Sequence, residues 1–437
     1  MKILYLNADR GIPVLGDKGA SVHVREFIAA LAGAGHEVVL ACASLGEGNA
    51  PPPARLLHIE PGAAQSELDA ACRAAGLPQT AQDERLTRRE LARLAYDRSL
   101  TPRVREALSD IGFVPDVIYE RHALFHGAGA RLARELGIVR LLEVNAPLIA
   151  EQERFRGLVL KSLAEEAEAR SFRGADAIFA VSQEVAAYIS STGIAPSRIH
   201  TVPNGVDLTR FHPAADGRTL RARLGLGSER VIGFIGSFKP WHGVGFLVEA
   251  FAHLAAAVGD VHLLCVGEGP ELEASRAAIA AHGLERRATF VGRIPHVEIP
   301  AYLAAMDVSL APYLPDPDFY FSPLKVVESL ACGTPVIAAR LGQLEQLVDH
   351  GQTGFLFAPG DAPDLLAHLG ALFADPRRHA LMRQAARTRA ERDFGWNRVV
   401  ERMTAEAARL IARRRAALAP GRRRWWRRGG SAGCCAM

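Results

Sequence analysis

The sequence predicts an α/β protein with two doubly wound parallel sheets, and three observations indicate this class. Short apolar runs rich in Val, Ile and Leu recur along the chain, many without polar alternation, which is typical of parallel strands buried on both faces. Longer segments with helical spacing separate these runs, as in right-handed strand–helix–strand units. A turn sequence at residues 204–207, followed by a polar stretch at 212–217, divides the runs into two groups.

The candidate strands follow this division. In the first group they are 2–8, 37–43, 55–59, 116–120, 140–145, 177–182 and 199–203, and in the second they are 231–237, 261–267, 289–293, 308–313, 335–339 and 354–358. We therefore expect a first domain over residues 1–205, with a charge-rich helical insertion at about 65–112, and a second domain over 206–394. A last helix at 395–418 is expected to pack back on the first domain, and a tail at 419–437 to be disordered.

The composition excludes several classes of protein. Of the 437 residues, 49% are hydrophobic and 23% are charged, which is typical of a globular protein and not of a disordered one. No apolar run reaches the roughly 18 residues that a membrane span needs. The first apolar run ends at Asn7, too soon for the core of a signal peptide, so we expect a cytoplasmic protein. The six cysteines show no C-x-x-C spacing, which favours reduced core cysteines over a metal or redox site.

The C-terminal segment is strongly basic. Residues 409–437 contain nine arginines and no acidic residue, against a net charge of +4 for the whole chain, so the preceding chain is mildly acidic. Trp425 and Trp426 lie inside an arginine cluster, which suits peripheral contact with an anionic membrane surface. Binding of this segment to nucleic acid is a weaker interpretation, because no other part of the chain forms a basic face. We therefore expect no nucleic-acid partner. A functionally silent tail fits the same sequence.

A helix predicted within residues 320–335 begins with the pattern of an anion site. Ser322 suits the N-cap, and Pro323 suits the first helical position. Lys325 falls in the first turn, where the helix dipole disfavours a cation. A phosphate bound at the helix start would make this lysine favourable, and Glu328, one turn further on, could face the same ligand. An ordinary helix with a solvated lysine fits the spacing equally.

A glycine-rich loop follows the first predicted strand. It covers residues 11–23 and includes Gly16 and Gly19, so its backbone could approach a ligand closely. Its spacing is not G-x-G-x-x-G, which argues against a dinucleotide site. A plain surface loop is the alternative.

Two further small-residue loops follow strands of the second domain. The loop at 236–243, GSFKPWHG, carries Lys239 and His242, either of which could face a phosphate. The loop at 267–270, GEGP, carries Glu268. Small residues at the carboxyl ends of parallel strands mark the usual ligand crevice, although a solvated lysine with a packing tryptophan also fits the first of these loops.

Several motifs, taken in order, resemble a known family. They are VSQEVAAYI, RIHTVPNGVDLTRFHP, FIGSFKPWHG, LLCVGEGPELE, FVGRIPHVEIPAYLAAMDVSLAPY and SPLKVVESLACGTPVIA. Over roughly residues 1–415 the chain is similar to family 4 of the retaining glycosyltransferases (glycosyl transferases group 1). This resemblance implies the GT-B architecture, two Rossmann-like domains with the active site in the cleft between them.

The resemblance also implies roles for individual residues. A nucleotide-sugar donor would lie mainly in the second domain, with its diphosphate on the backbone at Ser322–Leu324 and its ribose on Glu328. His122, after a predicted strand of the first domain, would lie beside the reacting sugar. We therefore expect the catalytic residues to be His122, Lys239, Lys325 and Glu328. The expected donor-binding residues are Gly16, Gly19, Asn204, Gly236, Ser237, His242, Glu268, Arg293, Ser322, Pro323 and Leu324.

Three positions depart from the family pattern. Tyr320 stands where the family usually has the first of two glutamates eight positions apart, and Ser237 and His242 stand where it has an arginine and a lysine that bind phosphate. Lys239 and Lys325 are plausible electrostatic replacements for the two lost cations. We interpret the segments around them as a coherent variant of the family site.

The expected function is transfer of a sugar from a nucleoside-diphosphate sugar to an acceptor hydroxyl with retention at the anomeric carbon, in cell-surface glycan or glycoconjugate synthesis. No convincing pair of catalytic carboxylates is present, so front-face attack, which the resemblance implies, is favoured. The helix-start N–H groups, Lys325 and Lys239 would stabilise the leaving diphosphate, so we expect no metal and no cofactor. The sequence leaves open whether the acceptor is a lipid-linked glycan, a polysaccharide or a small molecule. The first alternative is a nucleotide-sugar-binding or scaffold subunit without turnover. A less favoured alternative is a sugar-nucleotide epimerase or a phosphorylase of the same fold.

Overall fold

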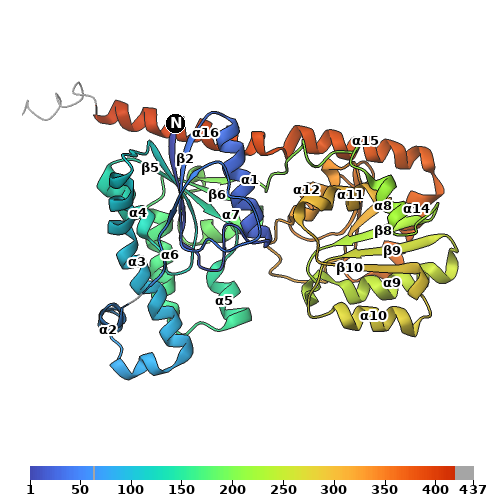
Figure 1. Cartoon of the computed structure of the whole chain (residues 1–437), viewed down its shortest axis with the longest axis horizontal. Coiled ribbons are helices and arrows are strands. Elements are labelled where there is room, and N and C mark those ends of the chain that lie inside the picture. Colours follow the sequence, from blue (N-terminus) through green and yellow to red (C-terminus); the bar gives the residue numbers. More distant parts are fainter. Residues whose placement is uncertain (63, 419–437) are drawn as a thin grey trace, which may run out of the picture.

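The computed structural model describes residues 1–62 and 64–418, which form two α/β domains side by side (Figure 1). Each domain contains one parallel sheet with helices on both faces. The basic segment around Trp425 lies outside the described residues. Within the described part of the chain, no helix is both long and apolar enough to cross a membrane.

The sheet of the first domain has the strand order β3-β2-β1-β4-β5-β6-β7. Its strands are β1 (Lys2–Asn7), β2 (Glu37–Cys42), β3 (Arg55–His58), β4 (Val117–Arg121), β5 (Val139–Val144), β6 (Ala177–Ala180) and β7 (Ile199–Thr201). β1 pairs with β2 on one side and with β4 on the other, so the order reverses there. Such a reversal opens a crevice at the carboxyl ends of the strands.

The sheet of the second domain has the order β10-β9-β8-β11-β12-β13. Its strands are β8 (Arg230–Ile235), β9 (Val261–Val266), β10 (Ala288–Gly292), β11 (Val308–Ala311), β12 (Val336–Ala339) and β13 (Gly354–Phe357). The order reverses at β8, between β9 and β11. Each of the thirteen predicted strand ranges overlaps one strand, with ends that differ by at most two residues. Continuous burial explains this agreement, since β5 and β9 are buried at every residue.

Helices connect the strands and cover the sheets. In the first domain they are α1 (Gly19–Gly33), α2 (Gln65–Ala74), α3 (Arg85–Asp110), α4 (Ala128–Leu136), α5 (Leu148–Arg156), α6 (Lys161–Arg173) and α7 (Gln183–Ser191). The later helices are α8 (Gly217–Arg223), α9 (Val244–Ala257), α10 (Leu272–Ala281), α11 (Ile299–Ala305), α12 (Leu324–Ala331), α13 (Leu344–Leu347), α14 (Ala362–Ala374), α15 (Pro376–Asp393) and α16 (Trp396–Leu418).

Over the described residues the chain crosses between the domains twice, and the two crossings touch. Val206 and Gly395 form a parallel bridge, with the amide of Val206 donating to the carbonyl of Phe394 at 2.8 Å. Beyond this bridge, α16 runs back along the first domain (Figure 1) and buries Trp396 and Met403 in the same core as Phe27. The last helix therefore completes one hydrophobic core of the first domain.

Candidate active site

A cavity of about 770 Å³ lies between the domains, at the carboxyl ends of strands from both sheets. Its lining from the first domain and the connecting segment is Asp17, Lys18, Gly19, Ala20, Val22, His23, Arg121, Asn145, Val181 and Asn204. Its lining from the second domain is Ile235, Gly236, Ser237, His242, Val266, Gly267, Glu268, Arg293, Ile294, His296, Ile299, Tyr313, Phe321, Ser322, Pro323, Leu324, Lys325 and Glu328. Both crevices expected from the reversals in strand order open into this one cavity.

Lys325 is a buried cation at the start of α12, on the cavity wall. Its Nζ has no hydrogen-bond partner among the described residues, and the side chain is only 9% exposed. The ammonium lies over two aromatic rings, 4.4 Å from the centre of Phe234 and 4.7 Å from that of Tyr313. Burial lowers the pKa of Lys325 from its ordinary value of 10.5 to about 7. Cation–π contacts offset part of the desolvation cost but supply no counter-ion.

The start of α12 differs by one residue from the prediction. The helix begins at Leu324, and Pro323 is the N-cap in extended conformation, without a side-chain cap. Ser322 does not cap the helix. Its hydroxyl accepts a hydrogen bond from the backbone amide of Asn204 at 3.5 Å, and its carbonyl accepts one from Asn204 Nδ2 at 2.8 Å. This bond fixes the connecting segment against the helix start, and the first backbone N–H groups of α12 have no cap to bind.

The loop after β8 places two of the predicted residues beside Lys325. His242 Nδ1 donates to the carbonyl of Ser237. Burial, and then the charge of Lys325, lower the pKa of His242 to about 3, so this histidine is neutral near pH 7. Gly267 shows why these loops are rich in glycine, because at its φ of +131° a Cβ would lie 1.9 Å from the carbonyl oxygen of Gly236.

The carboxylates that line the cavity are all paired with cationic groups or histidine. Glu328 Oε1 lies 2.7 Å from Nε2 of His296. Arg293 reaches Asp17 of the first domain at 2.7 Å and Glu268 at 3.4 Å, so one guanidinium links the two domains across the cavity. In the described parts of the chain, no group of three or more His, Cys, Asp or Glu side chains is placed to hold a metal ion.

The wall contributed by the first domain is organised around Glu143, which is only 2% exposed. Its Oε1 accepts hydrogen bonds from Arg121 and Asn145 and lies 2.9 Å from Nε2 of His23. Its Oε2 accepts a hydrogen bond from the hydroxyl of Tyr119 at 2.9 Å. Burial alone would raise the pKa of Glu143, but the charges of His23 and Arg121 and the hydrogen bonds hold it well below its usual range.

Most of the predicted site residues line the cavity, but Gly16, Lys239 and His122 do not. The carbonyl of Gly16 accepts from Arg25 in a turn. Lys239 lies over the ring of Trp241, with Nζ 6.0 Å from its centre.

His122 does not line the cavity, so its role beside the reacting sugar stays a prediction. Its Nε2 lies 3.2 Å from Glu168, and its ring packs 5.1 Å from that of Phe172. Strand alternation gives the reason, because consecutive side chains point to opposite faces and it is Arg121, the last residue of β4, that faces the cavity. The side chain expected beside a ligand at this strand end is therefore an arginine.

Sequence reasoning also missed residues that line the cavity. His23, Arg121, Asn145 and His296 received no role, and neither did Asp17. Arg121 and Asn145 could have been predicted to line the cavity, because both lie where a parallel strand ends. His23 lies within an apolar helical run and His296 in a short 3₁₀ turn, so neither had a distinctive pattern.

Tyr320 lies outside the cavity and joins the domains. Its hydroxyl donates to Glu151 Oε2 of α5 at 2.8 Å. The same helix contributes Arg154, which binds Asp316 at 3.1 Å, and Phe155, whose ring lies 5.2 Å from that of Trp241. The tyrosine that stands at the usual glutamate position thus belongs to a contact between α5 and the second domain.

Comparisons with known proteins agree with this architecture. The sequence-family model described as Glycosyltransferase Family 4 matches residues 18–210, and the family model described as Glycosyl transferases group 1 matches residues 229–375. The chain is 30% identical over 308 residues to D-inositol 3-phosphate glycosyltransferase 1 of Catenulispora acidiphila, covering 66% of this chain and 71% of that protein. It is 29% identical over 282 residues to the GDP-mannose-dependent alpha-(1-6)-phosphatidylinositol monomannoside mannosyltransferase of Mycolicibacterium smegmatis, covering 64% and 74%.

Solved structures share the fold at low sequence identity. Sucrose-phosphate synthase from Thermosynechococcus elongatus superposes with a TM-score of 0.69 at 22% identity, over 94% of this chain and 99% of that one. HepE of Anabaena in complex with UDP superposes with a TM-score of 0.67 at 21% identity, over 94% and 100%. These neighbours establish the arrangement of two Rossmann-like domains.

Proposed function

The chain belongs to family 4 of the glycosyltransferases, the glycosyl transferases of group 1, and we propose that it is a retaining member acting in glycan or glycoconjugate synthesis. It uses a nucleoside-diphosphate sugar as donor and transfers the sugar to an acceptor hydroxyl. The names of its relatives support a glycoconjugate role, since they include a phosphatidylinositol mannoside mannosyltransferase and an inositol phosphate glycosyltransferase. HepE, which shares the fold, was solved in complex with UDP, and this supports a nucleoside diphosphate as part of the donor.

Lys325 carries the proposal. A buried ammonium without an acidic partner is costly, and this one lies in the first turn of α12, whose uncapped start lines the cavity. A diphosphate bound there would supply the missing negative charge. The same groups would stabilise the charge that develops on the diphosphate as the sugar leaves, which is the main electrostatic task of this reaction.

The proposed route is front-face attack by the acceptor hydroxyl. A double-displacement route needs a free carboxylate as nucleophile. The carboxylates on the cavity wall, Asp17, Glu268 and Glu328, are each paired with Arg293 or His296. In the front-face route the donor phosphate helps to remove the acceptor proton, and the lysine and backbone N–H groups hold that phosphate in place. In our proposal, protein groups and not a metal ion hold the donor phosphate, so chelation of metal ions by EDTA should leave the rate unchanged.

A donor screen tests the proposal. The purified full chain is incubated with UDP-, GDP-, dTDP- and ADP-sugars and an acceptor panel, and nucleoside-diphosphate release and glycosylated products are measured by mass spectrometry. Lys325→Met should lower kcat by about 100- to 1,000-fold, as expected for loss of one preorganised charge-stabilising group. Lys239→Met is the matched control, because this lysine lies outside the cavity lining, and its kcat should stay close to that of the wild type.

The anomeric configuration of the product tests the retaining assignment separately. NMR of the purified product should give the configuration of the donor. An inverted linkage would overturn the front-face route while leaving glycosyl transfer intact. Equal rates for Lys325→Met and the wild type would overturn the role given to the lysine.

The acceptor is proposed to be attached to a membrane or to a growing glycan. The basic segment with Trp425 and Trp426, outside the described residues, supports the membrane alternative through its composition alone. Removing residues 420–437 should lower binding to vesicles that contain anionic phosphatidylglycerol. Unchanged binding would count against this alternative.

A further inference from the structure

Arg121 is an arginine on the cavity wall of the first domain, opposite the donor side, and it is only 7% exposed. It is the last residue of β4 and pairs in register with Glu143 of β5. Nη1 donates to Glu143 Oε1, which leaves other N–H groups of the five-donor guanidinium for a ligand. Because strand pairing rather than a loop fixes this side chain, its orientation is largely set before a ligand arrives.

Glu143 cannot turn away from Arg121. Tyr119 holds its other oxygen at 2.9 Å, and Asn145 and His23 approach the oxygen that Arg121 uses. His23 is in turn packed edge-on against Trp396 of α16, with ring centres 5.1 Å apart. One buried carboxylate thus orients three side chains that line the cavity.

The charges on the two walls suggest what this arrangement binds. The second domain contributes two cations, Lys325 and Arg293, and Arg293 is already paired with two carboxylates. Ser237 is neutral, and the pKa of His242 is too low for a charge near pH 7. Across the cavity, the guanidinium of Arg121 shares its carboxylate partner, Glu143, with the imidazole of His23. A guanidinium presents paired N–H groups that match phosphate oxygens.

We propose that Arg121 is a catalytic residue that binds the donor diphosphate from the first domain, and that Glu143 is the residue that positions it. This rests on the proposed function and adds a second cation to it. Lys325 and the start of α12 would hold the diphosphate from one side and Arg121 from the other. Donor binding would thereby draw the two domains together through the ligand.

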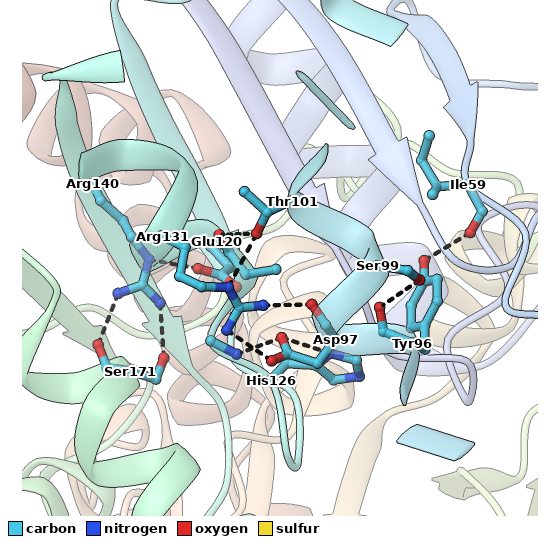
Figure 2. Close-up of polar contacts among 12 residues, drawn as sticks. Ile59, Tyr96, Asp97, Ser99, Thr101, Glu120, His126, Arg131, Arg140 and Ser171 are labelled. Atoms are coloured by element: carbon cyan, nitrogen blue, oxygen red, sulfur yellow. Dashed lines mark hydrogen bonds and ion pairs between the residues drawn. The ribbon is translucent and has the colours of Figure 1, made fainter. Parts of the chain in front are cut away.

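The fold provides a matched control on the same two strands. Glu120 of β4 and Arg140 of β5 form a second buried ion pair at 2.5 Å, in which Arg140 also donates to the carbonyl and hydroxyl of Ser171 at 2.8 Å (Figure 2). Their side chains are 2% and 0% exposed, and neither residue lines the cavity. Since Glu120 and Arg121 are consecutive in a strand, they point to opposite faces of the sheet.

The experiment compares Arg121→Gln, Glu143→Gln and Glu120→Gln in the full chain. Calorimetry gives the affinities for UDP, GDP, uridine and guanosine, and steady-state assays give kcat and donor KM. Arg121→Gln should weaken diphosphate binding about tenfold or more and leave nucleoside binding within about twofold, since only the phosphate contacts are lost. Its kcat should fall by about 100-fold, and Arg121→Lys should recover part of that loss.

The control separates positioning from stability. Glu143→Gln and Glu120→Gln should both lower the denaturation midpoint, because each leaves a buried arginine without its carboxylate. Only Glu143→Gln should reduce the ratio of diphosphate to nucleoside affinity in the folded protein. Equal ratios in Glu143→Gln and Glu120→Gln, or a wild-type ratio in Arg121→Gln, would overturn the inference.

Failure of this inference differs from failure of the proposed function. If Lys325→Met lowers the affinity ratio and Arg121→Gln does not, only the role of Arg121 is wrong. If the wild type binds neither diphosphate more tightly than its nucleoside, both the donor site and the role of Arg121 are wrong.

Discussion

The ammonium of Lys325 lies 4.4 Å from the ring centre of Phe234, and it has no hydrogen-bond partner among the described residues. Most buried ammonium groups in proteins are paired. This one is placed on the wall of the interdomain cavity, beside the uncapped start of α12. We interpret the unpaired charge as part of the donor site, with a cost in stability that the bound diphosphate removes.

The first prediction concerns stability. Lys325→Met should raise the free energy of unfolding at pH 7 by about 1–4 kcal/mol, because an apolar side chain of similar length replaces an uncompensated charge. The pKa of Lys325 is about 7 when folded and close to its ordinary 10.5 when unfolded, so between these values the unfolded chain binds more protons. Wild-type stability should therefore rise with pH in this window, and the advantage of the variant should shrink. Urea denaturation at pH 7 and pH 9.5 measures both effects, and a variant less stable at pH 7 would contradict them.

A second prediction tests whether Lys325 replaces the cations that the family pattern has at Ser237 and His242. His242→Lys alone should not raise kcat, because it places a second ammonium beside a buried one. In the Lys325→Met background the same substitution should raise kcat about tenfold over that of Lys325→Met alone, because the new lysine then places one positive charge near the diphosphate. Steady-state rates of the wild type, the two single variants and the double variant give the comparison. Independent, multiplicative effects would argue against compensation.

The third prediction concerns the contact between Tyr320 and Glu151. Tyr320→Phe should cost about 0.5–1.5 kcal/mol of stability by removing one hydrogen bond. Its kcat should stay near the wild-type value because Tyr320 does not line the cavity. Tyr320→Glu, which restores the usual family residue, should cost more because two carboxylates then meet, and Glu151→Gln should relieve that excess. A double-mutant cycle by denaturation measures the coupling, and a large loss of kcat in Tyr320→Phe would assign the tyrosine to the site instead.

The sequence predicts the fold well because burial on both faces of a parallel strand leaves a direct pattern. The run that became β9 contains one polar residue, His262, and the helix that follows β11 is marked by Pro323 and Gly333. The exact start of that helix was less predictable. Whether Ser322 caps it depends on Asn204, more than a hundred residues away, whose backbone amide donates to the Ser322 hydroxyl at 3.5 Å.

The cavity was only partly predictable. Residues in glycine-rich loops at strand ends, such as Gly236 and Glu268, could be assigned because loop position determines their location. The choice between Arg121 and His122 depends on the residue at which β4 ends, and a shift of one residue reverses the face. His23 and the contact of Tyr320 with Glu151 depend on how the two domains meet, for which local sequence carries no signal.

The protons taken up when a nucleoside diphosphate binds test the central claim most directly. Calorimetry at pH 8 in buffers of different ionisation enthalpy gives this number for UDP or GDP, whichever binds. Because the pKa of Lys325 is about 7 in the free protein, the lysine is mostly neutral at pH 8, and a bound diphosphate should raise its pKa and protonate it. We predict uptake of close to one proton by the wild type and none by Lys325→Met. No uptake by the wild type, or equal uptake by the variant, would contradict the account.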